Sequence, residues 1–223
     1  MAKGSRGGRR GGGKSSSGGS LLPAVIQPKA NKNANNQKVD LTTYLSNKNV
    51  QPISSEEAIK NTNPHYKDSW EYRSNCQRCV WAYELQRRGY NVEAKPTFKG
   101  DSLPRRGNWQ KLGGLQYDDK NGMFINGRTY KNEISSINEQ MKNWGDGSRA
   151  IVRVIWKNSN SGHVFNIENK GGKIFAYDAQ PGKKIDLSDY MSQSRRGYTA
   201  LFRTDNAKID MSQVADYVKM KGE

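Results

Sequence analysis

The chain has 223 residues, of which 33% are hydrophobic and 26% charged, and its formal net charge at pH 7 is +16. This length fits one domain of ordinary size with some excess. No stretch approaches the roughly 18 apolar residues that a membrane-spanning helix needs, so no transmembrane helix is expected. Two cysteines exclude a disulfide-rich scaffold, and two histidines exclude a histidine-rich metal site.

The first 20 residues form a basic tail, rich in glycine and serine, that we expect to be disordered. The first acidic residue is Asp40, and eight lysines and arginines precede it, so half of the net charge lies before it. Such a segment buries too little apolar surface to offset its chain entropy. No apolar run follows its basic residues, so no secretory signal peptide is expected. Arg6, Arg9 and Arg10 are candidates for contacts with nucleic-acid phosphates, the alternative being a solubilising linker.

The rest of the chain divides into a linker and one domain. Residues 21–62 are polar and are expected to form a linker with one short helix over 55–60, and the domain is expected to span 63–223. Helices are predicted over 75–88, 132–144 and 211–220, and strands over 90–94, 150–157, 163–168, 173–178 and 198–203. Helices followed by antiparallel strands indicate an α+β fold rather than alternating βαβ units.

The strands that contain His163 and Asp178 are predicted to form a hairpin. With Lys170-Gly171 as a two-residue turn, the two residues oppose each other at the end of an apolar face, and the other side of the hairpin is mainly polar. A carboxylate on one imidazole nitrogen fixes the tautomer and stabilises the imidazolium. The pair is therefore a candidate general base with its orienting acid. The alternative is an ordinary cross-strand pair, since a register change of one residue would separate the side chains.

A base of this kind serves a nucleophile, and the candidates are Cys76 and Cys79 at the start of the first predicted helix. A thiolate at a helix start is stabilised by free backbone N–H groups and by the positive end of the helix dipole. The same N–H groups can form an oxyanion hole. Cys76 directly follows Asn75, the expected N-cap, which favours Cys76 as the nucleophile. Asn75 is itself a candidate oxyanion group, with simple capping as the alternative.

Three alternatives exist for the two cysteines. They could be inert core residues, because they share one helical face with Val80 and Tyr83. They could bind zinc together with His65 and His163, although one C-x-x-C motif is a weak metal signal. They could also form a redox dithiol, for which the expected βαβ context is missing.

Four separated blocks carry a resemblance to a known family. They are NCQRCVWAYELQRRGYNVEA, WGDGSRAIVRVIW, GHVFNIENKGGKIFAYDAQPG and LFRTDN, within roughly residues 63–208. Together they resemble the papain-fold toxin family, the glutamine-deamidase-like domains of polymorphic toxins and phage head-associated proteins. The resemblance implies a papain-like α+β fold, in which a helix carrying the cysteine packs on an antiparallel sheet.

The resemblance also implies a Cys-His-Asp triad that needs no metal or organic cofactor. The histidine is then His163 in the GHVF block and the aspartate Asp178 in the YDAQ block. The nucleophile is Cys76 or Cys79, the latter being similar to the second cysteine of a papain-like C-x-x-C followed by aromatic and alanine residues. Gln180, just after the aspartate, is a candidate to line the site, with a turn residue as the alternative.

The activity implied is hydrolysis of a glutamine side-chain amide in a target protein, giving glutamate and ammonia. A papain-like cysteine peptidase, a transglutaminase and an inactive descendant are alternatives, as is a basic nucleic-acid-binding or phage virion structural protein. Expected partners are the target protein, nucleic acid or a capsid through the basic tail, and an immunity protein. The expected location is the cytoplasm of the producer, the virion or a target cell. Trp109, Tyr117 and Arg105-Arg106 lie in a loop-rich region that we expect to shape the substrate cleft.

Overall fold

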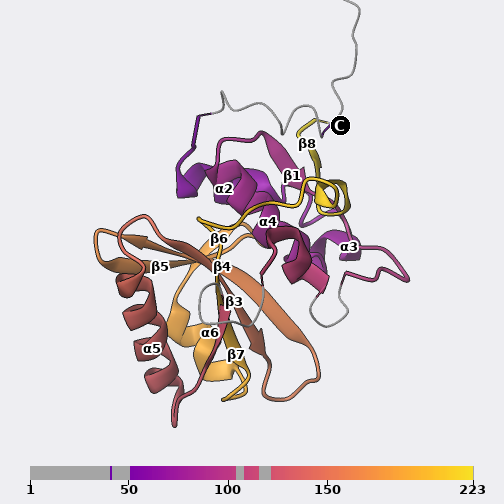
Figure 1. Ribbon diagram of the computed structural model, residues 1–223. Coiled ribbons are helices and arrows are strands. Elements are labelled where there is room, and N and C mark those ends of the chain that lie inside the picture. The colour runs from indigo at the N-terminus through magenta and orange to yellow at the C-terminus, as the bar shows by residue number, and fades with distance from the viewer. Residues whose placement is uncertain (1–40, 42–50, 104–107, 116–121, 223) are drawn as a thin grey trace, which may run out of the picture. The chain divides into compact units, whose positions relative to one another are not determined.

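The computed structural model describes residues 41, 51–103, 108–115 and 122–222 (Figure 1). Several sequence-predicted contact residues lie outside this part of the chain: Arg6, Arg9, Arg10, Arg105, Arg106 and Tyr117. Within the described residues, no helix has the length and apolar character required to cross a bilayer.

A six-stranded antiparallel sheet forms the centre of the domain, with the strand order β2-β7-β3-β4-β5-β6. Its strands are β2 (Gly122–Ile125), β3 (Arg149–Ile155), β4 (Gly162–Lys170), β5 (Lys173–Asp178), β6 (Lys183–Ile185) and β7 (Thr199–Arg203). The four central strands are those that the sequence predicts. The two edge strands were missed because each is short and lies in a polar stretch, so their pairing partners rather than their own pattern define them.

One face of the sheet is covered by α4 (Cys76–Arg87), with α2 (Ser55–Thr62) packed beside it (Figure 1). The short elements α3 (Trp70–Arg73), η1 (Asn108–Gly113) and η2 (Val214–Asp216) belong to the same half of the domain. The sequence predicts a linker that ends at residue 62 and contains α2. However, Ala58 and Ile59 are buried in the core with α4, so the packed domain extends at least as far back as this helix.

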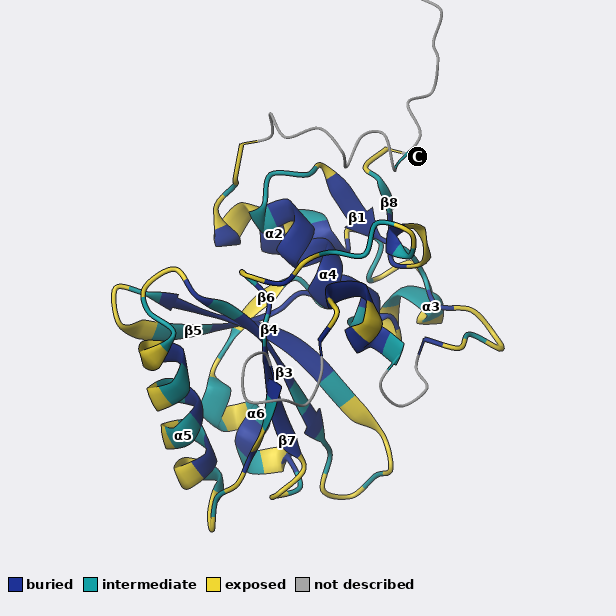
Figure 2. Ribbon diagram, in the orientation of Figure 1, coloured by how far each residue is buried: buried dark blue, intermediate teal, exposed yellow. Residues whose placement is uncertain are grey.

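The opposite face is covered by α5 (Tyr130–Asn143) and α6 (Leu187–Gln193), as Figure 1 shows. Thr129 caps α5 by accepting a hydrogen bond from the Asn132 N–H. Ile137 and Met141 of this helix bury their side chains in the same cluster as Phe165 of β4. The central strands are therefore buried on both faces (Figure 2), including the hairpin face that the sequence analysis took as mainly polar.

The predicted C-terminal helix over 211–220 is wrong. The chain there forms η2 and then β8 (Val218–Met220), which pairs with β1 (Val92–Ala94) in a separate two-stranded sheet. Val214, Tyr217 and Val218 are all buried, so the spacing of apolar residues correctly indicates burial. Strand pairing across the domain overrides the local helical pattern.

The turn between β4 and β5 differs from the prediction by one residue. Lys170 pairs with Lys173, so the turn consists of Gly171 and Gly172, whose φ angles are 59° and 80°. A tight hairpin turn needs positive φ at both central residues, which glycine adopts without strain and lysine does not. Each residue of β4 therefore pairs with a β5 residue two positions later than predicted. Because the shift is an even number of residues, every side chain stays on the predicted face of the hairpin.

Candidate active site

His163 and Asp178 are hydrogen-bonded, with 2.9 Å between His163 Nε2 and Asp178 Oδ2. His163 lies near the start of β4, and Asp178 is the last residue of β5. The observed register pairs Asn166 with Tyr177, so Asp178 lies beside Phe165, two residues from His163. The two side chains are thus diagonal neighbours rather than directly opposed, and they meet because diagonal pairs on one face remain within reach of long side chains.

The Asp178 carboxylate is buried and takes part in three hydrogen bonds with other described residues. Tyr190 of α6 donates its hydroxyl to Oδ2 at 2.6 Å, and the Gln180 backbone N–H donates to Oδ1 at 3.1 Å. Burial and the neighbouring Asp178 charge raise the pKa of Tyr190, which therefore remains a donor at neutral pH. Tyr190 is not among the residues that the sequence singles out, because the polar segment that carries it has no clear helical pattern.

Aromatic side chains enclose the His163–Asp178 pair. The Trp156 ring is stacked on the His163 ring, with 5.9 Å between centroids and 20° between planes. Tyr190 stands at 68° to Trp156 and at 77° to Phe165, in edge-to-face contacts. These rings exclude water from the hydrogen bond, and a lower local dielectric strengthens the interaction between imidazole and carboxylate.

Cys76 is the first residue of α4, is partly buried, and lies against the His163 ring. Burial lowers the pKa of His163, but hydrogen bonding to Asp178 and to Cys76 outweighs burial and raises the pKa to about 10. The ring is therefore a cation at neutral pH, placed between a carboxylate and a sulfur. An imidazolium beside a sulfur is the environment that favours a thiolate.

The first turn of α4 also has backbone N–H groups that are available to donate hydrogen bonds. The N–H groups of Arg78 and Cys79 both donate to the Asn75 carbonyl oxygen, at 2.8 and 3.1 Å. Among the described residues, the N–H groups of Cys76 and Gln77 have no acceptor. The first N–H groups of a helix lack partners within the helix, and they can stabilise a negative oxygen formed beside the sulfur.

Cys79 lies one turn further along α4 in a different environment. Its side chain is fully buried, and its Sγ–H donates to Asn75 Oδ1 at 3.1 Å. Burial raises the pKa of the Cys79 thiol well above its ordinary value, and the charges of Cys76 and Asp178 raise it further. Cys79 is therefore a neutral core thiol at physiological pH.

A cluster of three side-chain amides contacts Cys79 through Asn75 and also contains Asn63 and Gln180. Asn75 stands at the N-cap position, but its side chain makes no capping hydrogen bond, so the capping alternative is wrong. Its Nδ2 donates instead to the Lys95 carbonyl oxygen at 3.0 Å, and its Oδ1 lies 3.5 Å from Gln180 Nε2. Asn63, which the sequence analysis did not single out, donates to the Gln180 carbonyl oxygen at 2.7 Å. The cluster thus ties the start of α4 to the loop after β5.

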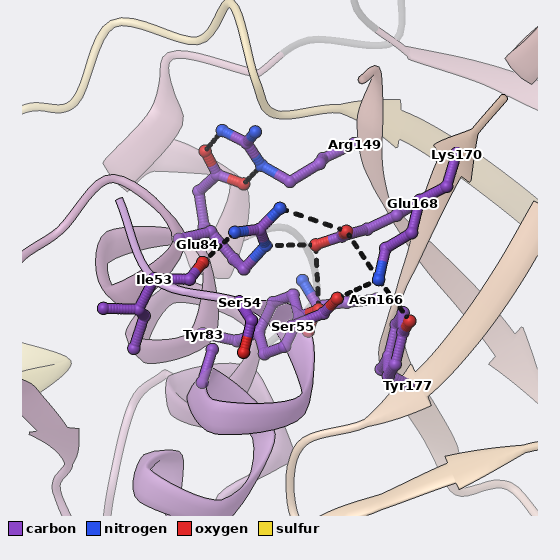
Figure 3. A network of polar contacts seen from close by, with 12 residues as sticks. Ile53, Ser54, Ser55, Tyr83, Glu84, Arg149, Asn166, Glu168, Lys170 and Tyr177 are labelled. Carbon is purple, nitrogen blue, oxygen red and sulfur yellow. Dashed lines mark hydrogen bonds and ion pairs between the residues drawn. The ribbon is translucent and has the colours of Figure 1, made fainter. Parts of the chain in front are cut away.

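A buried polar network fixes α4 against the sheet (Figure 3). Glu168 of β4 accepts hydrogen bonds from Tyr83 at 2.8 Å and from Arg87 at 2.7 Å, both on α4. Glu84 of the same helix accepts two hydrogen bonds from Arg149 of β3, at 2.9 and 2.8 Å. Both carboxylates are almost completely buried. Since α4 carries Cys76 and β4 carries His163, this network sets the position of the sulfur relative to the ring.

Two other residues that the sequence singles out have their contacts elsewhere in the domain. Trp109 is 3% exposed and packs edge-to-face on Phe202 at 5.0 Å between centroids, so it is a core residue rather than part of a cleft rim. His65 is hydrogen-bonded to Asp68 at 2.8 Å and lies 3.6 Å from Glu93. Across the ranges that the structure describes, no three His, Cys, Asp or Glu side chains are grouped to hold a metal ion.

The part of the chain that carries Cys76, His163 and Asp178 matches a known protein family. Residues 74–183, about half of the chain, match the family described as papain fold toxin 1, glutamine deamidase. This segment belongs to that family. The papain-fold toxin match includes Cys76, His163, Asp178 and Gln180 and ends before Tyr190. Among curated proteins, none matches the chain.

Proposed function

We propose that this domain converts a glutamine of a target protein to glutamate, with Cys76 as nucleophile, His163 as acid and base, and Asp178 as the orienting group. The observation that carries the proposal is the position of Cys76 against the ring whose Nε2 is held by Asp178. Membership of a glutamine deamidase family supports amide hydrolysis as the reaction. The buried, neutral thiol of Cys79 favours Cys76 as the nucleophile.

In the first half-reaction, the Cys76 thiolate attacks the carbon of the substrate carboxamide. The carbonyl oxygen becomes an oxyanion, which the N–H groups of Cys76 and Gln77 stabilise. The carbon–nitrogen bond then breaks as protonated His163 gives its proton to the nitrogen, which leaves as ammonia. A thioester between Cys76 and the substrate remains.

In the second half-reaction, His163 is neutral and takes a proton from water while the water oxygen adds to the thioester carbon. The carbon–sulfur bond breaks, and the electron pair returns to the Cys76 sulfur. The product is glutamate, and the imidazolium and thiolate are restored. Asp178 keeps the ring in one tautomer through both steps, because its carboxylate accepts from Nε2 and leaves Nδ1 to exchange the proton.

Mass spectrometry of a glutamine-containing protein or peptide tests the proposal directly. Deamidation gives a mass gain of about one dalton together with one ammonia for each modified glutamine. Peptide fragments would instead identify a peptidase, and attachment of an added primary amine would identify a transglutaminase. Cys76→Ser and His163→Ala are expected to release no ammonia. Unchanged ammonia release by either variant would contradict the assigned roles.

The target protein is the partner that this proposal requires. Contact of the basic tail with nucleic acid or a capsid, binding of an immunity protein, and location in the cytoplasm, the virion or a target cell stay predictions from the sequence.

A further inference from the structure

An exposed surface of arginines and aromatic rings lies beside the candidate active site. We call it the arginine–aromatic patch and define it by Arg128, Arg195, Arg196, Phe124 and Tyr198. Phe124 is 46% and Tyr198 48% exposed, which is unusual for large hydrophobic side chains in this domain. Exposed aromatic groups of this kind are typical of surfaces that bind a partner.

The patch is connected to His163 through Trp156. The Trp156 ring is stacked on the His163 ring, and its backbone forms a bridge with Ser194. Arg195 follows Ser194 directly, and its N–H donates to the Ile155 carbonyl oxygen at 2.7 Å. The loop that carries Arg195 and Arg196 is therefore paired with the residue whose ring is stacked on His163.

Internal contacts order the patch. The Arg195 guanidinium lies over the Tyr198 ring at 5.4 Å from its centroid, and Arg196 donates to the Arg128 carbonyl oxygen. Arg153 of β3 donates to the Tyr198 carbonyl oxygen at 3.2 Å and lies over the Phe124 ring at 5.8 Å. When a guanidinium is stacked on an aromatic ring, the N–H donors at the edge of the guanidinium stay free to bind a carboxylate.

The positive charge of the patch has no carboxylate partner within the described chain. Arg128, Arg195 and Arg196 form no ion pair there, in contrast to the arginines of α4. The surrounding segments 126–132, 156–163 and 194–200 contain no aspartate or glutamate. The carboxylate that reaches this loop, Glu133, is buried and accepts a hydrogen bond from the Gly197 N–H at 2.9 Å.

We infer that the arginine–aromatic patch binds an acidic segment of the target protein next to the glutamine that is modified. The inference rests on the proposed function, because it takes the substrate to be a protein that lies over His163. Arginine forks bind carboxylates through paired hydrogen bonds, and the exposed rings add apolar contact. An acidic polypeptide is favoured over nucleic acid because the patch adjoins a site that belongs to a family acting on glutamine.

The test compares two peptides of equal length, each with one glutamine, flanked in one by glutamates and in the other by serines. The wild-type protein is expected to show a kcat/KM about tenfold higher for the acidic peptide at low salt, and less at high salt. The double variant Arg195→Gln/Arg196→Gln should lose this preference and retain its rate on the serine peptide. The control Lys142→Gln/Lys173→Gln removes the same charge from exposed positions at the opposite end of β4 and should keep the preference.

Binding to the inert Cys76→Ser variant separates this inference from the proposed function. Fluorescence anisotropy should show tighter binding of the acidic peptide, lost when Arg195 and Arg196 are also replaced. Selective binding without ammonia release by the wild-type protein would refute the deamidase proposal and keep the patch. Ammonia release with no charge preference would refute the patch and keep the deamidase. Tighter, arginine-dependent binding of a single-stranded oligonucleotide of equal charge would make the patch a nucleic-acid surface and overturn the inference.

Discussion

Tyr190 and His163 share one oxygen of Asp178: the tyrosine hydroxyl donates to Oδ2 at 2.6 Å, and His163 Nε2 lies 2.9 Å from the same atom. The carboxylate is thus held from two directions, by the sheet that carries the histidine and by α6. A carboxylate fixed in this way cannot rotate away from the ring when the ring gains or loses its proton.

Replacing Tyr190 with Phe is expected to lower kcat for ammonia release about tenfold with little change in KM. The ring still packs against Trp156, but Asp178 loses a charge-assisted hydrogen bond and some of its orientation. The matched control is Tyr130→Phe in α5, whose hydroxyl makes no hydrogen bond to another described residue. Equal kinetics for Y190F and wild type would mean that Tyr190 has no positioning role.

Substitution of the two cysteines should have opposite consequences. Cys76→Ser should abolish turnover, whereas Cys79→Ser should retain it and lower the free energy of unfolding by about 1 kcal/mol, because a polar hydroxyl replaces a buried thiol. Iodoacetamide at pH 7 should alkylate Cys76 and spare Cys79 in the folded protein, as read by peptide mass spectrometry. Loss of turnover in C79S, with retention in C76S, would reverse the assignment.

Asp178→Asn is expected to reduce kcat at least about a hundredfold while the fold is kept. The amide has no charge to stabilise the imidazolium, and its NH₂ group favours the wrong histidine tautomer. Asp189→Asn is a suitable control, since Asp189 is exposed on the same helix as Tyr190. Circular dichroism of both variants checks the fold, and a D178N rate close to that of D189N would contradict the role of Asp178.

His163 should make the stability of the domain depend on pH. Its pKa rises from 6.5 to about 10 on folding, so the folded protein holds this proton more tightly than the unfolded chain. The resulting stabilisation is complete below pH 6.5 and is lost as the pH rises towards 10, by up to about 1.4 kcal/mol per pH unit. Urea unfolding at pH 6 and pH 9 measures it by comparison with His163→Gln. A parallel pH dependence of the two proteins would show that His163 does not carry the effect.

Glu168→Gln should destabilise the domain by about 2 kcal/mol, because Arg87 would keep a largely buried guanidinium without its carboxylate. The control is Glu57→Gln on the exposed side of α2, with an expected change of less than about 0.5 kcal/mol. Urea denaturation measures both changes. Equal stability of E168Q and E57Q would mean that the network in Figure 3 does not hold α4 on the sheet.

The sequence predicts the central part of this fold because its elements have strong local patterns. The helix that starts at Cys76 has a good N-cap residue, no helix breaker and a glycine after its end, the four central strands are rich in β-forming residues, and all five elements are confirmed. The edge strands and β8 are too short to have a periodicity of their own and exist through their partners. The turn at Gly171-Gly172 was misplaced because the two adjacent glycines, not the symmetry of the hairpin, determine which residues take positive φ.

The sequence predicts two parts of the candidate site. The alternation of side chains along the hairpin predicts that His163 and Asp178 share a face, and the predicted helix start gives the position of the cysteines. The observed pairing differs from the predicted one by two residues, which leaves His163 and Asp178 on the same face of the hairpin. The predicted contact between them is therefore present although the predicted register was wrong. The role of Tyr190 was not predictable, because it depends on how α6 packs across the sheet. The interaction of Asn75 with Lys95 and Gln180 in place of capping likewise follows from loops that no periodicity describes.

The sulfur and the ring that would activate it belong to separate layers of the molecule, α4 on one side and the sheet on the other. Under the proposed mechanism, a newly made or partly folded copy has its thiol but not the partner that makes it reactive. Deamidase activity would then begin only once the two layers have packed together, and any agent that separates α4 from the sheet would inactivate the protein without contacting its catalytic atoms.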